Sequence, residues 1–447
     1  MKALIDTLRN IFKIPELKNR ILYTLLLLAV YRLGSFIILP GVDSSELQSN
    51  FGNAGAGGNL LDLFNVFLGG AFARGSILAL GIMPYISASI VVQLLGAVLP
   101  SIQKLRSEGE SGQKKMNQIT RYLTVAITFG QAISYVVYLK GQFPGAAAGL
   151  SSTFFWITTV CILTASTMFL VWLGERITDN GIGNGVSLII MIGIIARFPP
   201  TLINEARSTL PMIFFIEILA LGIVTMAVVA LTQATRKIPV NYARQMMGNR
   251  IGQLGRGNAA RQYIPLKVNS AGVMPIIFAQ AIMFLPTTLI QLSGAESLTG
   301  IASVLGNFNG LWYNVIFFLI IIAFTYFYTA ITVNPNEIAD QLKRNGGFIP
   351  GVKPGKRTAA YIETVLSRIT LPGSIFLAFV SILPAIAMGM GTSQSFSQFF
   401  GGTTLLIMIG VVLDTLQQIE SYLLMRHYDG LMQSGRIKGR STKGLAV

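Results

Sequence analysis

Long apolar runs, separated by shorter polar segments, are the main pattern along the chain. A helix needs about 20 mainly apolar residues to cross the hydrocarbon core of a bilayer. Ten stretches meet this requirement, and the fifth is the weakest because Arg197 and Pro199-Pro200 follow its charge-free part. We predict spanning helices at 21–39, 75–99, 122–139, 153–173, 183–203, 211–235, 269–292, 310–332, 369–390 and 402–425. The pattern therefore predicts an all-α, polytopic membrane protein.

The polar segments between these spans differ strongly in their lysine and arginine content. With the N-terminus placed inside, the inner segments hold 29 of the 34 lysines and arginines, the outer segments hold 4, and Arg32 falls within the first span. Cytoplasmic segments of membrane proteins are enriched in these two residues. We therefore predict that both termini are cytoplasmic. No cleavage-site pattern follows Leu39, so we expect the first span to be retained in the protein.

Composition supports the membrane assignment and excludes several other classes. Only 12% of the residues are charged, whereas soluble domains have about 25%. The net charge is +16, but no basic run alternates with aromatic residues as a nucleic-acid stacking platform would require. The single cysteine, Cys161, lies in an apolar run, and the single histidine, His427, follows the last span. We therefore expect no metal site, no cofactor and no Cys/His catalysis.

The N-terminal segment 1–20 has an amphipathic pattern. Leu4, Leu8 and Ile11 fall on one face of a helix, while Arg9 falls elsewhere. We expect this helix to lie on the inner leaflet of the membrane.

The segment 59–70 is apolar but too short to span. It follows the glycine-rich stretch 52–58, carries Asp62 and ends in Gly69-Gly70. Such a piece is tolerated at membrane depth only where protein buries it or where it lines a cavity. A re-entrant half-helix and a helix on the outer surface both fit, and the residues alone favour the surface helix.

Ionisable residues are rare within the predicted spans. Arg32 and Glu217 lie near outer helix ends, from which their side chains can reach the interface. Asp414 lies deeper, where a structural carboxylate is favoured over a role in ion coupling. An ion-driven transporter places polar ligands near the middle of the membrane. The scarcity of such residues argues against that class.

Two inner segments, 236–268 and 333–368, are larger than a simple connection requires. The first carries seven cationic and no acidic residues. A basic loop is most simply a determinant of orientation. The excess of charge also indicates docking of an anionic partner such as ribosomal RNA or an acidic protein surface.

Several strings of residues, spread along nearly the whole chain, resemble those of a known family. They are Arg32-Leu-Gly-Ser-Phe36, Ala79-Leu-Gly-Ile-Met-Pro-Tyr-Ile-Ser-Ala-Ser-Ile90, Glu108-Gly-Glu-Ser-Gly112, Trp172-Leu-Gly-Glu175, Gly181-Ile-Gly-Asn-Gly185, Pro265-Leu-Lys-Val-Asn269 and Gly401-Gly-Thr403. In order and spacing they resemble the SecY family of protein-conducting channels, in its bacterial form.

The resemblance implies ten transmembrane helices in two inverted pseudo-symmetric five-helix halves, 21–203 and 204–425, around a central hourglass pore with a re-entrant plug. The segment 1–20 and the tail 426–447 would be cytoplasmic. At the waist the family has a ring of isoleucines, and the matching positions are Ile82, Ile86, Ile190, Ile277 and Ile407. Branched apolar side chains can exclude water and ions while deforming around a peptide.

The resemblance also assigns a plug over about 59–74, which reverses the preference for a surface helix. Its matching residues are Leu60, Leu61, Asp62, Leu63, Phe64, Asn65, Phe67, Gly69, Gly70 and Arg74. The second and seventh spans would form a lateral gate, with Ser87, Gln93 and Asn269 as polar candidates along it.

The two large basic segments correspond to the family's docking surface for the ribosome and the SecA motor. The candidate contacts are Arg236, Lys237, Arg244, Arg250, Arg256, Lys353, Lys356 and Arg357. The family has an arginine before the Pro-Gly pair where this chain has Lys353. Lysine keeps the charge but loses the bidentate fork of arginine.

The implied function is that of the central channel subunit of the Sec translocase. Such a subunit passes unfolded secretory polypeptides across the bacterial plasma membrane and releases transmembrane segments sideways into lipid. It is not an enzyme, and the implied partners are SecE, SecG, SecA, the ribosome, nascent chains and the lipid bilayer. A secondary transporter with inverted repeats is the alternative, and a membrane scaffold would leave the plug and the isoleucine ring without a role.

Overall fold

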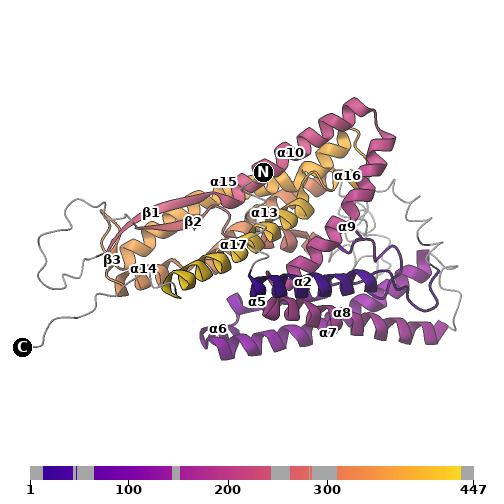
Figure 1. Ribbon diagram of the computed structural model, residues 1–447, viewed down its shortest axis with the longest axis horizontal. Helices are drawn as coiled ribbons and strands as arrows, with labels where there is room; N and C mark the ends of the chain where they lie inside the picture. Colours follow the sequence, from indigo (N-terminus) through magenta and orange to yellow (C-terminus); the bar gives the residue numbers. More distant parts are fainter. Residues whose placement is uncertain are drawn as a thin grey trace, which may run out of the picture.

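The computed structural model describes residues 14–43, 47, 65–142, 152–242, 262–280, 282–283 and 310–433. This part is mainly helical, as predicted (Figure 1). Its N-terminal helices are α2 (Pro15–Gly34), α5 (Met83–Val98), α6 (Pro100–Ser107), α7 (Glu110–Gln142), α8 (Ser152–Asn180) and α9 (Gly185–Ser208). Its C-terminal helices are α10 (Pro211–Gln233), α13 (Leu311–Thr332), α14 (Pro335–Arg344), α15 (Lys356–Gly389), α16 (Gln394–Ser397) and α17 (Gly402–Gln433).

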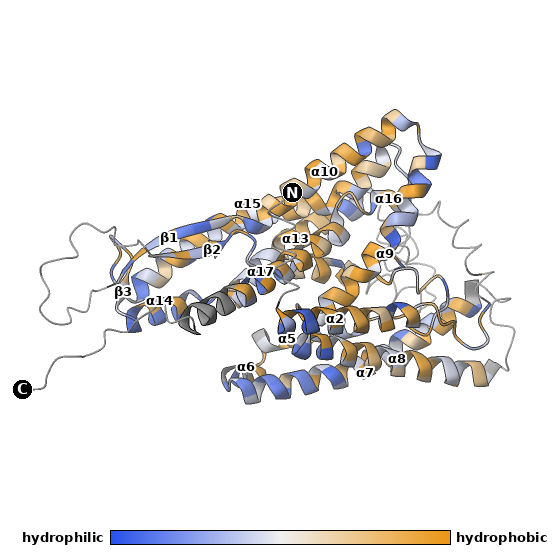
Figure 2. Cartoon of the chain, in the orientation of Figure 1, coloured by the Kyte–Doolittle hydropathy of each residue, from blue (hydrophilic) through white to orange (hydrophobic). Residues whose placement is uncertain are grey.

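Seven helices in the described residues are long and apolar enough to cross a membrane. They correspond to the predicted spans three to six and eight to ten, and their apolar residues are evident in Figure 2. Hydrophilic residues gather at one end of the molecule, over α6, the start of α7 and α14, as expected if that end lies in water. These helices confirm a multi-pass membrane protein.

The other three predicted spans differ from the helices observed. α2 ends at Gly34, because the chain turns at Ser35 and Ile38 then pairs with Ser76 in a β-bridge. α5 begins at Met83 rather than at 75, since the preceding stretch consists of turns that contain glycines with positive φ. In the seventh predicted span, residues 269–273 form turns and helical turns cover 274–280 and 282–283, while 281 and 284–292 lie outside the described residues.

α9 extends further than predicted. It passes through Pro199-Pro200 and ends at Ser208, beyond the predicted boundary at 203 between the two halves. Asn184 caps its start by accepting hydrogen bonds from the backbone N–H groups of Val186 and Ser187. The predicted turn at Gly181-Ile-Gly-Asn-Gly185 therefore leads directly into this helix.

A small antiparallel sheet lies where only loops were predicted. β1 (Thr235–Tyr242) pairs with β2 (Gln262–Lys267) and with β3 (Gly347–Phe348), in the order β2-β1-β3. Its buried side chains, Ile238, Val240 and Leu266, pack against α14 and the first turns of α15. This module projects beyond the long helices at the same end as α6 (Figure 1).

The helices form two groups with α9 between them. α2, α5, α7 and α8 pack together, and α8 contacts α9. α13, α15 and α17 form the second group, and α9 contacts α10, α16 and α17 from that side (Figure 1). The contact between the two groups creates the interior in which the candidate pore lies.

Candidate pore and plug

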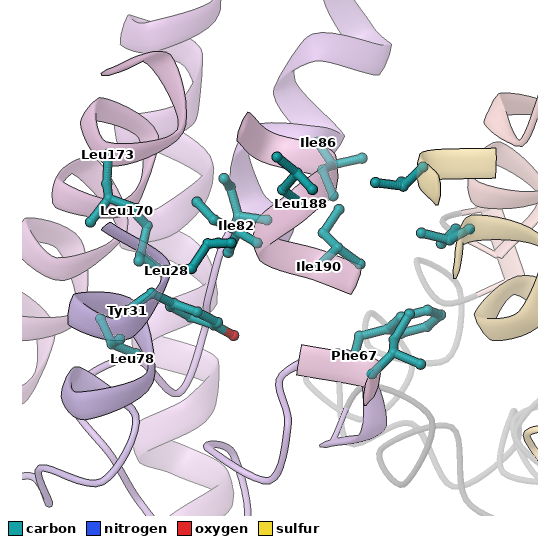
Figure 3. Packing of buried hydrophobic residues seen from close by; sticks show 14 of the residues in the cluster. Leu28, Tyr31, Phe67, Leu78, Ile82, Ile86, Leu170, Leu173, Leu188 and Ile190 are labelled. Atoms are coloured by element: carbon teal, nitrogen blue, oxygen red, sulfur yellow. The ribbon is translucent and has the colours of Figure 1, made fainter. Parts of the chain in front are cut away.

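The five isoleucines predicted for the pore ring meet in one place. Ile82, Ile86, Ile190 and Ile407 are buried in a single hydrophobic cluster, and Ile277 packs against it. Figure 3 shows the side chains of Ile82, Ile86 and Ile190 beside one another. They come from the start of α5, from α9, from the turns at 274–280 and from α17, so both helix groups contribute.

Local structure sets the positions of the first two isoleucines. Gly81 has a φ of 57°, a left-handed conformation that glycine adopts readily, and it turns the chain into α5. Ile82 precedes the helix, and Pro84 occupies its first turn, where a missing N–H costs little. The N–H of Ile86 donates to the carbonyl of Ile82 at 3.2 Å, which places both side chains on one helix face.

The described part of the plug candidate is buried inside the protein. Phe67 belongs to the isoleucine cluster (Figure 3), and Asn65 is only 6% exposed. The preference of the residues alone for a surface helix is therefore wrong for residues 65–70, because helix packing around them excludes water. Leu60, Leu61, Asp62, Leu63 and Phe64 lie outside the described residues.

A compact turn follows Phe67. The carbonyl of Asn65 accepts from the N–H of Gly70 at 2.8 Å, and its side-chain oxygen accepts from the N–H of Ala73 at 3.1 Å. The hydroxyl of Tyr135 on α7 donates to the carbonyl of Phe72 at 3.1 Å. The C-terminal end of the candidate plug is therefore attached to the first helix group.

The three lateral-gate candidates do not form a connected polar line. Gln93 donates to Ser89 on its own helix at 3.3 Å. Asn269 is buried, and its side-chain oxygen accepts no hydrogen bond in the described structure. Ser87 is partly buried on α5. Their role in a gate stays a prediction.

The docking candidates that the structure describes are exposed. Arg236 and Lys237 lie on β1, and Lys353, Lys356 and Arg357 lie at and before the start of α15. None of these five takes part in an ion pair with another described residue. Arg244, Arg250 and Arg256 fall outside the described residues. The sheet and the start of α15 therefore present exposed cationic side chains on a folded surface.

The rare ionisable residues of the spans are not where the sequence suggested. Glu217 is buried on α10 rather than extended to the interface, and its Oε2 has no hydrogen-bond partner among the described atoms. Asp414 is exposed on α17 instead of buried as a structural carboxylate. Neither position could be read from hydropathy, since burial depends on the neighbouring helices.

Comparison with known proteins decides between the families that such a pore could represent. The model of the SecY family matches residues 76–416. The chain belongs to the SecY family. It is 42% identical over 436 residues to the "Protein translocase subunit SecY" of Streptomyces galbus, covering 94% of this chain and 98% of that one. The protein of the same name from Thermotoga maritima is 38% identical over 437 residues, covering 97% and 99%.

Solved structures share the SecY-family fold. "The structure of a protein conducting channel" superposes with a TM-score of 0.62 at 17% identity, covering 90% of this chain and 91% of that one. "Sec61 in the Canine ribosome-channel complex from the endoplasmic reticulum" has a TM-score of 0.58 at 16% identity, with the same coverage. At these identities the likeness shows the fold of ten helices in two halves.

Sequence reasoning missed two polar contacts between the helix groups of this SecY-family chain. The N–H of Gly183 donates to the side chain of Gln418 at 2.9 Å. The carboxylate of Glu205 accepts from the N–H of Ser393 at 3.1 Å and from its hydroxyl. Gly183 belongs to a motif that the sequence flagged, but no sequence signal points to its distant partner.

Proposed function

We propose that this chain is the channel subunit of a Sec translocase. It passes unfolded secretory polypeptides across the plasma membrane and releases transmembrane segments sideways into lipid. The curated relatives carry the name of a protein translocase subunit, and the structural neighbours are protein-conducting channels. The family is a channel family, and the energy for transport comes from a bound motor, a translating ribosome or the membrane potential.

The convergence of the isoleucines supports this function best. Five isoleucines, far apart in sequence and drawn from both helix groups, meet around one point beside Phe67. A ring of branched apolar side chains holds no stable water column, so it resists ions at rest. The side chains change rotamer easily and can fit closely around a peptide of any sequence. Such a ring suits a channel for varied polypeptides.

A secondary transporter is less well supported. Transporters place polar ligands and unwound backbone around a substrate near the middle of the membrane. The cluster at the centre of the described residues is hydrophobic. We therefore assign the plug to residues 59–74 and the lateral gate to the second and seventh spans, with Ser87, Gln93 and Asn269 along it.

The partners follow from the exposed basic surface and from the family. SecE and SecG are assigned as further subunits, and the sheet module with the start of α15 as the surface for SecA and the ribosome. Two of the similar structures are ribosome-bound channels. We infer from the positive charge of the inner segments that this surface and both termini lie in the cytoplasm of a bacterium.

Ion leak through reconstituted vesicles tests the pore. Ile190→Gly removes a buried side chain from the ring, so water should enter and the resting ion conductance should rise about tenfold or more. Ile195→Gly is the matched control, since Ile195 lies on the same helix but is 37% exposed and outside the cluster. Equal conductance in the two variants would count against the ring.

Import of a signal-bearing precursor tests the function itself. Vesicles that contain this chain with SecE are given SecA and ATP, and protease-protected precursor is measured. An authentic complex serves as the positive control. Import by that complex, combined with none by this chain, would refute the proposed function.

A further inference from the structure

The base of the plug lies directly on the backbone of α9. A β-carbon at Gly193 would be 2.3 Å from the carbonyl oxygen of Phe67 and 3.4 Å from the N of Gly69. A β-carbon at Gly69 would be 3.0 Å from the carbonyl oxygen of Gly193, and its φ of 62° also favours glycine. We call this contact between Gly193 and residues 67–69 the glycine seat. Only glycine allows so close an approach at either position.

Arginine side chains from separate parts of the fold surround the same turn. The Nη1 atom of Arg32, on α2, would lie 2.6 Å from a β-carbon at Gly69. The Nε atom of Arg197, on α9, would lie 3.1 Å from a β-carbon at Gly70. The guanidinium carbons of Arg32 and Arg74 lie 5.4 and 4.5 Å from the centre of the Phe36 ring. Arg32 and Arg74 therefore share one aromatic ring and lie close to each other.

Among the described residues, the charges of Arg32 and Arg74 find little compensation. In each, the Nη1 atom is buried and has no hydrogen-bond partner among the described residues. No described carboxylate forms an ion pair with either side chain. Burial, and then the neighbouring charge of Arg32, lowers the pKa of Arg74 below its usual value. The ring of Phe36 offsets only part of the cost of partly removing two cations from water.

We propose that the plug is kept in place by the shape of the glycine seat, while the partly buried charges of Arg32 and Arg74 oppose it, so that the plug is poised to leave. This inference rests on the assignment of residues 65–74 to a plug. Departure of the turn breaks the close backbone packing at Gly193. It also lets water reach the two guanidinium groups, which lowers their free energy. The closed position of the plug therefore reflects a balance between favourable backbone packing at Gly193 and the unfavourable dehydration of the two guanidinium groups.

Substitutions in the glycine seat and substitutions of the two arginines should therefore have opposite effects on plug departure. Gly193→Ala inserts a methyl group into the seat and should favour plug departure. Gly222→Ala is its matched control, because a β-carbon at Gly222 on α10 meets nothing within 4 Å. Arg32→Gln and Arg74→Gln remove charge and should favour closure. Arg32→Lys keeps the charge and should behave as the parent does. Arg207→Gln is the control for loss of charge, because it removes an exposed charge from the end of α9.

Chemical labelling of the turn measures departure directly. The single native cysteine, Cys161, is replaced by serine, and Ala71, which is 1% exposed, is replaced by cysteine. The full complex is reconstituted in vesicles with its outer face accessible to a membrane-impermeant maleimide. The labelling rate at position 71 then reports how often the turn leaves its buried position.

We expect Gly193→Ala to label about fivefold faster or more, because overpacking a tight contact is costly. We expect each glutamine variant to label about threefold slower or more, because the cost of burying a cation is removed. Labelling of Gly193→Ala at the rate of Gly222→Ala would overturn the seat. Unchanged or faster labelling in both glutamine variants would overturn the opposing role of the arginines.

Precursor import by the parent is measured in the same vesicles. If the parent imports no precursor, the proposed channel function fails, whatever the labelling rates. If the parent imports normally and Gly193→Ala labels like its control, the glycine seat alone fails.

Discussion

The two helix groups meet along two seams that differ in chemistry. At the first, which we call the α9–α17 seam and which also includes α2 and the start of α16, polar groups bond across the boundary. Glu205 accepts two hydrogen bonds from Ser393, and Gly183 donates to Gln418. The guanidinium of Arg20 on α2 also lies over the ring of Tyr422 on α17, at 5.4 Å. Separation of this seam would leave several polar groups without partners.

The second seam lies between α5 and residues 273–280, and we call it the α5 seam. It is built from apolar side chains, including Ile82 and Ile86 on one side and Phe278 on the other. No side-chain hydrogen bond crosses it among the described residues. Gln93, a polar residue on α5, bonds to Ser89 within its own helix. Apolar side chains that separate within a membrane exchange protein contacts for lipid contacts at small cost.

The difference indicates which seam can open. A broken buried hydrogen bond costs about 1–3 kcal/mol per unpaired group, and more where the group is charged. We therefore expect the α9–α17 seam to stay closed as a hinge while the α5 seam opens toward lipid. The predictions below test this contrast, from the largest effect to the smallest.

Loss of the Glu205 carboxylate should have the largest effect. Glu205→Ala leaves both donors of Ser393 unpaired at a site where Glu205 is 0% exposed. We expect a loss of about 2–4 kcal/mol, seen as a lower apparent Tm of the complex in mild detergent. Glu205→Gln keeps an acceptor and should lose less. Glu420→Gln, an exposed carboxylate on α17, is the control and should leave the Tm unchanged.

Gln418→Leu should have an intermediate effect, because it removes the acceptor of the Gly183 N–H but leaves Glu205 intact. We expect a loss of about 1 kcal/mol. A distance measurement between spin labels on α8 and α17 should also show a broader distribution. The adjacent Gln417→Leu adds the same apolar bulk without removing that bond. A similar broadening in Gln417→Leu would contradict a hinge role for Gln418.

Gln93→Leu should have the smallest effect on stability, within about 0.5 kcal/mol, because its hydrogen bond lies within α5 and crosses no boundary. The variant makes the α5 seam more apolar. We expect lateral release of a marginally hydrophobic test segment to change while the Tm does not, as measured by glycosylation or protease mapping of that segment. A large fall in Tm would mean that Gln93 ties the two helix groups together after all.

Much of the candidate site followed from the sequence, but not its three-dimensional form. The isoleucine positions came from motif resemblance, and the structure brings them together. Glu217 and Asp414 were placed wrongly, since hydropathy reports the average environment of a helix and not the face that a neighbour covers. The strands at 235–242 and 262–267 were missed because their exposed, cationic pattern reads as loop.

By itself, the sequence determined most of the apolar helices, and it predicts the side of the membrane on which the basic segments lie. These are local properties: about 20 apolar residues make a span, and lysine and arginine set its orientation. Only the tertiary structure decided that Gly193 lies against the backbone of residues 67–69, that Arg32 and Arg74 share one ring, and that Glu205 bonds to Ser393. Each of these contacts joins residues remote in sequence, and its free energy depends on distances and burial that exist only after the helices pack.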